Sequence, residues 1–200
     1  DIEKDNRALF EELEISKQKE LCVQWMNQYP VIFLTFKKVD GLNFKSAYEM
    51  LEATIAEFCQ RHSFLMESKK IAKEQKEVFQ RLKECRASGT ELKNSLEFLA
   101  RMMQIHYGKQ VILLLDEYDV PIAKASSNGY YKEMLEVMKA MMPPTRTLSM
   151  VLAKLSSSTR MSFRIMSRFS SSSGYALRFS AITVSATSER KVRLIPNRRP

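Results

Sequence analysis

A continuous apolar run that ends in acidic residues constrains this chain more than any other feature. Five apolar residues, Val111 to Leu115, lead directly into Asp116 and Glu117, and a third acid, Asp119, follows. Uninterrupted apolar runs of this length are typical of strands in parallel sheets, which helices cover on both faces. Carboxylates at the carboxyl end of such a strand lie in the crevice where α/β proteins bind ligands. The run therefore predicts a buried parallel strand with a binding site at its end.

The acids that follow the strand resemble the Walker B element of a P-loop NTPase. In that pattern Asp116 holds Mg²⁺ through its water shell, and Glu117 orients the attacking water. Asp119 belongs to the same run and is an accessory candidate. The alternative interpretation of these residues is a buried strand that ends in a solvated acidic turn, without any nucleotide chemistry.

The motif that accompanies a Walker B element is not found in the sequence. A phosphate-binding loop reads Gly-x-x-x-x-Gly-Lys-Ser/Thr, because its backbone amides and its lysine surround the phosphates. None of the five glycines starts or ends such a run, and Gly108-Lys109 is followed by Gln110. The chain begins at Asp1 and not at Met. We therefore expect a fragment whose phosphate loop lies upstream, and which by itself binds no Mg-ATP and hydrolyses none.

Composition sets the remaining bounds. A length of 200 residues with 44% hydrophobic residues allows one ordinary domain with a core. No apolar stretch reaches 18 residues and no signal peptide is visible, so we expect a cytoplasmic protein without a membrane partner. Cys22, Cys59 and Cys85 are far apart and form no CxxC pair, which predicts reduced thiols. His62 and His106 are too few for a metal site, and both are expected to be structural.

The order of elements predicts an α/β fold. A second apolar run, Tyr29 to Phe36, is rich in β-branched and aromatic residues and predicts another buried strand. Apolar residues at helical spacing fill much of 43–107, which is longer than one crossover needs, so we expect a helical insert. A loop over 119–129 and a helix over 130–142 follow. The prediction is a P-loop NTPase-like parallel sheet, incomplete, with a helical insert.

As a set, several segments resemble the AAA-ATPase-like proteins of gut and anaerobic bacteria, which often carry a PD-(D/E)xK nuclease-like region. The matching segments are residues 1–7, 29–37, 41–48, 91–99, 107–121 and 128–131. The resemblance covers about residues 1–142 and implies a partial AAA-ATPase-like domain that begins just after the Walker A loop. It also implies Mg-ATP as the cofactor of the intact protein, with Asp116 as the metal residue and Glu117 as the catalytic residue. Through the nuclease-like region, the resemblance also implies nucleic acid as a possible partner.

Residues 143–200 differ sharply from the rest. They contain 11 basic residues and a single acid, Glu189, which leaves 21 basic and 22 acidic residues in 1–142. The segment is rich in Ser and Arg and includes the low-complexity run Ser170–Ser173. We expect an irregular tail, either disordered or translated out of frame. The alternatives are a basic arm that binds single-stranded nucleic acid, which would make the chain a non-catalytic interaction module, and an irregular folded extension.

Overall fold

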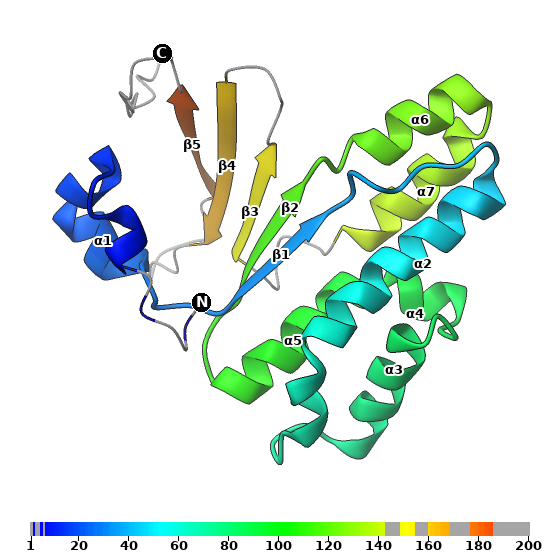
Figure 1. Cartoon of the computed structure of the whole chain (residues 1–200), viewed down its shortest axis with the longest axis horizontal. Helices are drawn as coiled ribbons and strands as arrows, with labels where there is room; N and C mark the ends of the chain where they lie inside the picture. The colour runs from blue at the N-terminus through cyan, green and yellow to red at the C-terminus, as the bar shows by residue number, and fades with distance from the viewer. Residues whose placement is uncertain are drawn as a thin grey trace.

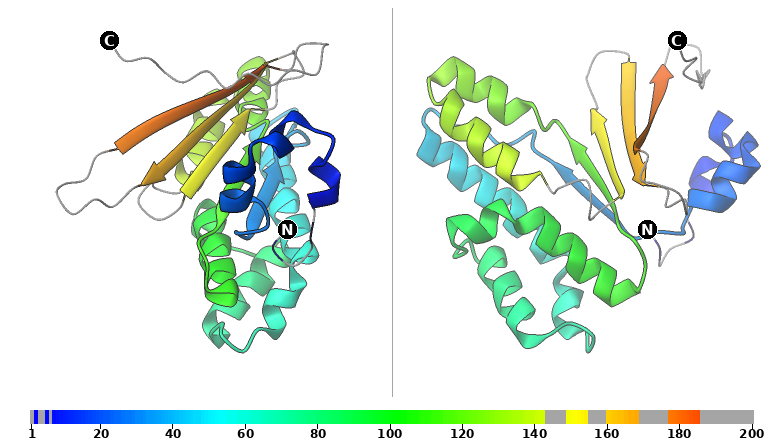
Figure 2. Two further views of the ribbon diagram at one scale, coloured as in Figure 1. Left: turned by 90° about the vertical axis from the view of Figure 1, so that its left-hand side faces the viewer. Right: turned by 180° about the vertical axis from the view of Figure 1, so that it is seen from behind.

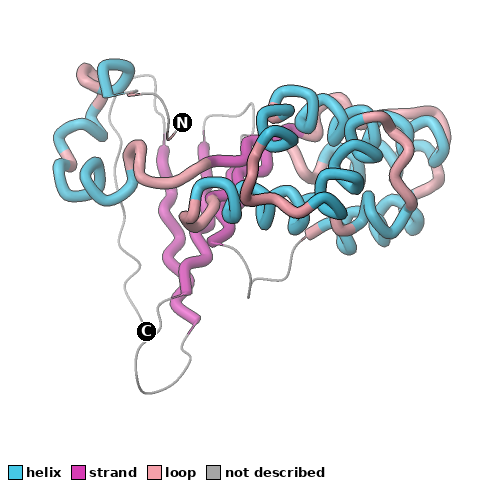
Figure 3. Tube along the Cα trace, turned by 90° about the horizontal axis from the view of Figure 1, so that it is seen from below, coloured by secondary structure: helices cyan, strands magenta, loops and turns pink. Residues whose placement is uncertain are grey.

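The computed structural model describes residues 2, 5 and 7–142, together with the backbone of 149–154, 160–168 and 177–185. These residues form a mixed α/β structure that is mostly helical (Figures 1 and 3). The helices are η1 (Arg7–Phe10), η2 (Glu14–Lys17), α1 (Lys19–Trp25), α2 (Phe44–Arg61), η3 (Ser63–Glu67), α3 (Lys73–Lys83), α4 (Gly89–Lys93), α5 (Ser95–Tyr107), α6 (Val120–Asn128) and α7 (Tyr131–Met141). The strands are β1 (Val31–Thr35), β2 (Ile112–Asp116), β3 (Ser149–Lys154), β4 (Arg160–Arg168) and β5 (Leu177–Ser185).

The two apolar runs pair as the sequence predicts. β1 and β2 are parallel neighbours, in a register that starts at Val31 opposite Ile112 and ends at Thr35 opposite Asp116. β3 adds to β2 in parallel, and β4 and β5 follow in antiparallel order. The parallel pairing of the strand before the acids with the strand at 31–35 is therefore confirmed.

The pair β1–β2 is covered unevenly. Side chains alternate between the faces of a strand, and residues opposite each other point to the same face. Ile32, Leu34, Leu113 and Leu115 are all buried on one face. On the other face Phe33 is 45% exposed. Helices α2 to α7 gather on the side of the buried face, and α1 lies apart from them (Figures 1 and 2).

The helical insert is present and shares its core with the sheet. It comprises α2, η3, α3, α4 and α5, and its buried residues join those of β1 and β2 in one cluster. Asn43 and Ser88 cap α2 and α4, each in a reciprocal capping box. A hydrogen-bonded ion pair with Arg81, and the N–H of Ser88, hold the pKa of Glu91 down at about 2. Gly108 ends α5 in the left-handed conformation, which glycine adopts without strain.

One element was missed by sequence reasoning. Residues 119–129 were expected to be a loop, but Val120–Asn128 form α6. Pro121 lies in the first turn of this helix, where a backbone N–H has no partner within the helix, so that proline loses no hydrogen bond there. Gly129 ends the helix with a left-handed φ of 81°. Pro at the start and Gly just past the end are a helix signature, so the expectation of a loop is wrong.

The expectation of an irregular tail also needs correction. Strands β3, β4 and β5 occupy 149–154, 160–168 and 177–185, where no regular structure was expected. Apolar residues alternate with Ser and Arg over 160–165 of β4 and in the first half of β5, a period of two that is typical of strands. The high serine and arginine content of the segment favours an irregular tail, whereas the alternation favours strands. The rest of the predicted tail lies outside the described residues.

The three cysteines are free thiols, as expected. Cys59 is fully buried in α2, and burial raises the pKa of its thiol to about 12. Cys85 is exposed and Cys22 is partly exposed. Among the described residues no helix has the length and apolar character needed to span a bilayer.

Candidate functional site

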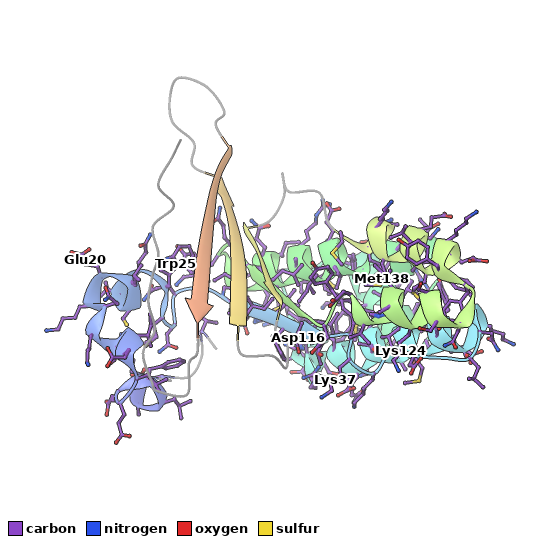
Figure 4. The ribbon with its side chains drawn as sticks, turned by 90° about the horizontal axis from the view of Figure 1, so that it is seen from above. Glu20, Trp25, Lys37, Asp116, Lys124 and Met138 are labelled. Atoms are coloured by element: carbon purple, nitrogen blue, oxygen red, sulfur yellow. The ribbon has the colours of Figure 1, made fainter. Side chains whose placement is uncertain are left out.

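The predicted acids lie at the carboxyl edge of the parallel pair. Asp116 is the last residue of β2 and stands opposite Thr35, the last residue of β1. Its carbonyl oxygen accepts a hydrogen bond of 3.0 Å from the N–H of Phe36, which extends the ladder by one step. Because paired residues share a face, the Asp116 carboxylate lies beside Thr35 on the less covered face of the sheet. Figure 4 shows Asp116 at this end of the strands, near Lys37.

Asp116 has a buried side-chain oxygen that nothing nearby satisfies. Its Oδ1 is inaccessible to solvent and accepts no hydrogen bond from any described residue. Buried polar atoms are nearly always hydrogen-bonded, because leaving one unpaired costs about 1–3 kcal/mol. Hard cations such as Mg²⁺ prefer carboxylate oxygens of this kind. The side chain therefore fits a cation, or a water held by one.

A cation at this position would take few ligands from the protein. In the described part of the chain no three His, Cys, Asp or Glu side chains come together in a metal-binding group. Mg²⁺ commonly keeps several waters and binds one or two carboxylates together with phosphate oxygens. The arrangement at Asp116 suits that mode of binding better than a cage made wholly of protein ligands.

Glu117 is held in an unusual backbone conformation. Its φ is 53°, in the left-handed region that residues with a Cβ seldom adopt. Its carbonyl oxygen accepts a hydrogen bond of 3.1 Å from the N–H of Val120, which starts the turn into α6. Asp119 follows as the residue before α6, and its carbonyl oxygen accepts from Ala123 at 2.9 Å. Strained conformations of this kind collect at functional sites, where geometry outweighs stability.

Replacing Glu117 by glycine is expected to stabilise the fold. Glycine adopts positive φ without strain, so the free energy of unfolding should rise by about 1 kcal/mol. Urea denaturation followed by circular dichroism measures the change. The matched control is Glu133→Gly on the exposed side of α7, which should lose about 1 kcal/mol because glycine disfavours helix. A loss of similar size at both positions would show that Glu117 is not strained.

Basic residues lie near the acids. Lys37 directly follows the end of β1, is exposed, and forms no ion pair with a described residue. Lys124 of α6 forms an ion pair of 3.1 Å with Asp40. Hydrogen bonds from Lys124 and from the N–H of Gly41 hold the pKa of Asp40 below its usual value. The edge therefore offers acids for a cation and one unpaired lysine for an anion. Thr35 and Lys37 carried no sequence motif, and only the register of β1 against β2 places them here.

Comparison with known proteins decides the family. The model described as "Predicted AAA-ATPase", for the AAA-ATPase-like family, matches residues 1–156. The chain belongs to the AAA-ATPase-like family. This confirms the resemblance seen in the sequence, and the match runs past residue 142 into β3. No curated protein and no solved structure matches the chain.

Proposed function

We propose that the chain supplies the metal- and water-binding half of an ATPase site of the P-loop class. Asp116 is the residue for Mg²⁺, Glu117 orients the attacking water, and Asp119 supports the turn that carries them. Membership of the AAA-ATPase-like family supports this function. The observation that carries the proposal is the buried, unpartnered Oδ1 of Asp116 at the carboxyl end of a parallel strand.

Two further features support these roles. Ligands of open α/β sheets bind beyond the carboxyl ends of the strands, which is where both acids lie. The strained φ of 53° at Glu117 turns this residue out of the strand immediately after Asp116. The two adjacent acids therefore differ in backbone conformation, Asp116 in the strand and Glu117 in the turn after it. This difference supports separate roles as a metal residue and a water residue.

The residues that would surround the nucleotide phosphates are not in this sequence. No Gly-x-x-x-x-Gly-Lys-Ser/Thr run occurs among its 200 residues, and acidic side chains alone repel a polyphosphate. We propose that ATP is held by the combination of this segment with a phosphate loop elsewhere, and that the Walker B acids become catalytic only in that combination.

Calorimetric titration of the chain with Mg-ATP tests this division. We expect no binding tighter than the millimolar range, because backbone amides for the phosphates are missing. The Asp116→Asn variant should give the same weak signal. Micromolar affinity in the unaltered chain would reveal a phosphate site within these 200 residues and would contradict the proposed division.

A further inference from the structure

A pocket separate from the site at the acids, called the second pocket below, lies at the opposite end of the strands. It has a volume of about 400 Å³ and is lined by residues from the start of β1 and from the carboxyl ends of α2 and α5. Four lining residues, Ile2, Pro30, Val31 and Phe33, come from the amino end of the chain and from β1. The others, Arg61, His62, Phe64, Met103 and Tyr107, come from the helical insert. This volume falls in the range of small-molecule sites, and no role proposed above uses these residues.

The lining is unusually rich in exposed aromatic rings. Phe33 is 45% exposed and Phe64 is 37% exposed. The Phe64 ring meets that of Tyr107 edge to face, with centroids 6.3 Å apart. Large aromatic side chains left open to water beside a pocket are typical of surfaces on which another flat ring stacks.

His62 lines the pocket and offers one hydrogen-bond acceptor. Its ring stacks on Phe58 with centroids 4.0 Å apart. Burial lowers the pKa of His62, which favours the neutral form of the ring. In the neutral ring, Nδ1 donates its hydrogen to the carbonyl oxygen of Phe58 at 2.9 Å. Nε2 is then an acceptor for a ligand N–H.

The charges in the pocket and at its rim favour different parts of a ligand. Arg61 and Tyr107 end α2 and α5, so both helices direct the negative ends of their dipoles toward the pocket. This disfavours a phosphate inside and favours a ring that carries N–H donors. Arg61 itself is exposed and forms no ion pair with a described residue. It is available for an anion at the rim.

We propose that this pocket takes one unstacked base of a single-stranded nucleic acid, with the adjoining phosphate at the rim beside Arg61. The base stacks against Phe64 and Phe33, and its N–H groups face the acceptors of His62 and the helix ends. The site is independent of the acids at the other end of the sheet. Its failure would leave the proposed ATPase role untouched.

The test compares two strands that differ only in their bases. The whole chain is titrated into a fluorescein-labelled oligodeoxycytidine of about 15 nucleotides, and into an abasic strand of equal length, with anisotropy as the readout. Any purely electrostatic binding, including that of the basic residues in 143–200, is common to both strands. We expect the strand with bases to bind about tenfold more tightly, in line with stacking of one base.

Variants assign the difference to the pocket. Phe64→Ala should reduce the ratio of the two affinities to about one, and Phe64→Trp should preserve it, because the larger ring still stacks. Tyr131→Ala removes an aromatic ring that is 44% exposed on α7, away from the pocket, and should leave the ratio unchanged. Arg61→Ala should weaken binding of both strands. It should also reduce the slope of log affinity against log salt concentration by about one.

Three outcomes would overturn the inference. The first is equal affinity of the unaltered chain for both strands, which would leave an apolar side chain of a protein partner as the better occupant. The second is a ratio unchanged by Phe64→Ala. The third is an equal loss of the ratio of the two affinities in Phe64→Trp and Tyr131→Ala. Such a result would show that the ratio depends on the general integrity of the fold and not on the pocket.

Discussion

Replacing Gly41 by alanine is expected to lower the free energy of unfolding by about 3 kcal/mol. Gly41 lies between β1 and α2, against the first turn of that helix. An added Cβ would meet the backbone nitrogen of Ala47 at 2.5 Å and the carbonyl carbon of Ser46 at 2.9 Å. Backbone atoms inside a capped helix cannot move aside as the end of a flexible side chain can.

The same glycine joins three parts of the fold. Its carbonyl oxygen accepts hydrogen bonds from the Tyr130 hydroxyl at 2.7 Å and from Asn128 Nδ2 at 3.0 Å. A displaced Gly41 therefore disturbs the contact of this loop with α6 and α7. Thermal unfolding should show a fall in Tm of roughly 6–12 °C for a chain of this size. The matched control is Gly89→Ala, where the nearest atom is the Tyr48 hydroxyl at 3.4 Å. An unchanged Tm for Gly41→Ala would refute the close packing.

Phe58→Ala should cost about 3–5 kcal/mol, because it leaves a cavity in the middle of the core. Phe58 is fully buried in α2 and stacks on His62. Its loss removes both the packing of α2 and the ring that supports the His62 wall of the second pocket. Chemical denaturation measures the loss. Leu42→Ala, at a side chain that is 88% exposed, is the control and should change stability by less than about 0.5 kcal/mol. Equal effects at both positions would contradict the assigned core.

The parallel strand pair was predictable because its signal is local. Five successive apolar residues in 111–115 and the β-branched run at 31–36 are typical of strands buried inside a sheet. The helix α2 was predictable for the same reason, since its buried residues repeat at helical spacing. In each case the residues that make the pattern are also the residues that become buried.

The failures have physical causes that are equally specific. Residues 120–128 combine Pro121 with Ser126, Ser127 and Asn128, whose loop-like composition concealed a helix with a proline start.

The candidate site was predictable only in part. The position of Asp116 after a strand follows from the sequence, but its unpartnered Oδ1 depends on all its neighbours in space. The left-handed φ of Glu117 has no local signal, since glycine or asparagine is the usual residue there. The second pocket draws on residues from 2 to 107, so that no window of sequence contains it.

Paramagnetic broadening by Mn²⁺, used in place of Mg²⁺, tests the central claim most directly. In a ¹⁵N-labelled chain, millimolar Mn²⁺ should broaden the amide signals of residues 113–119 before others, and Asp116→Asn should abolish that broadening. Asp40→Asn, which removes a carboxylate already paired with Lys124 at 3.1 Å, is the matched control and should leave the broadening in place. Broadening centred elsewhere, or equal in the Asp116→Asn variant, would contradict the assignment of Asp116 as the metal residue.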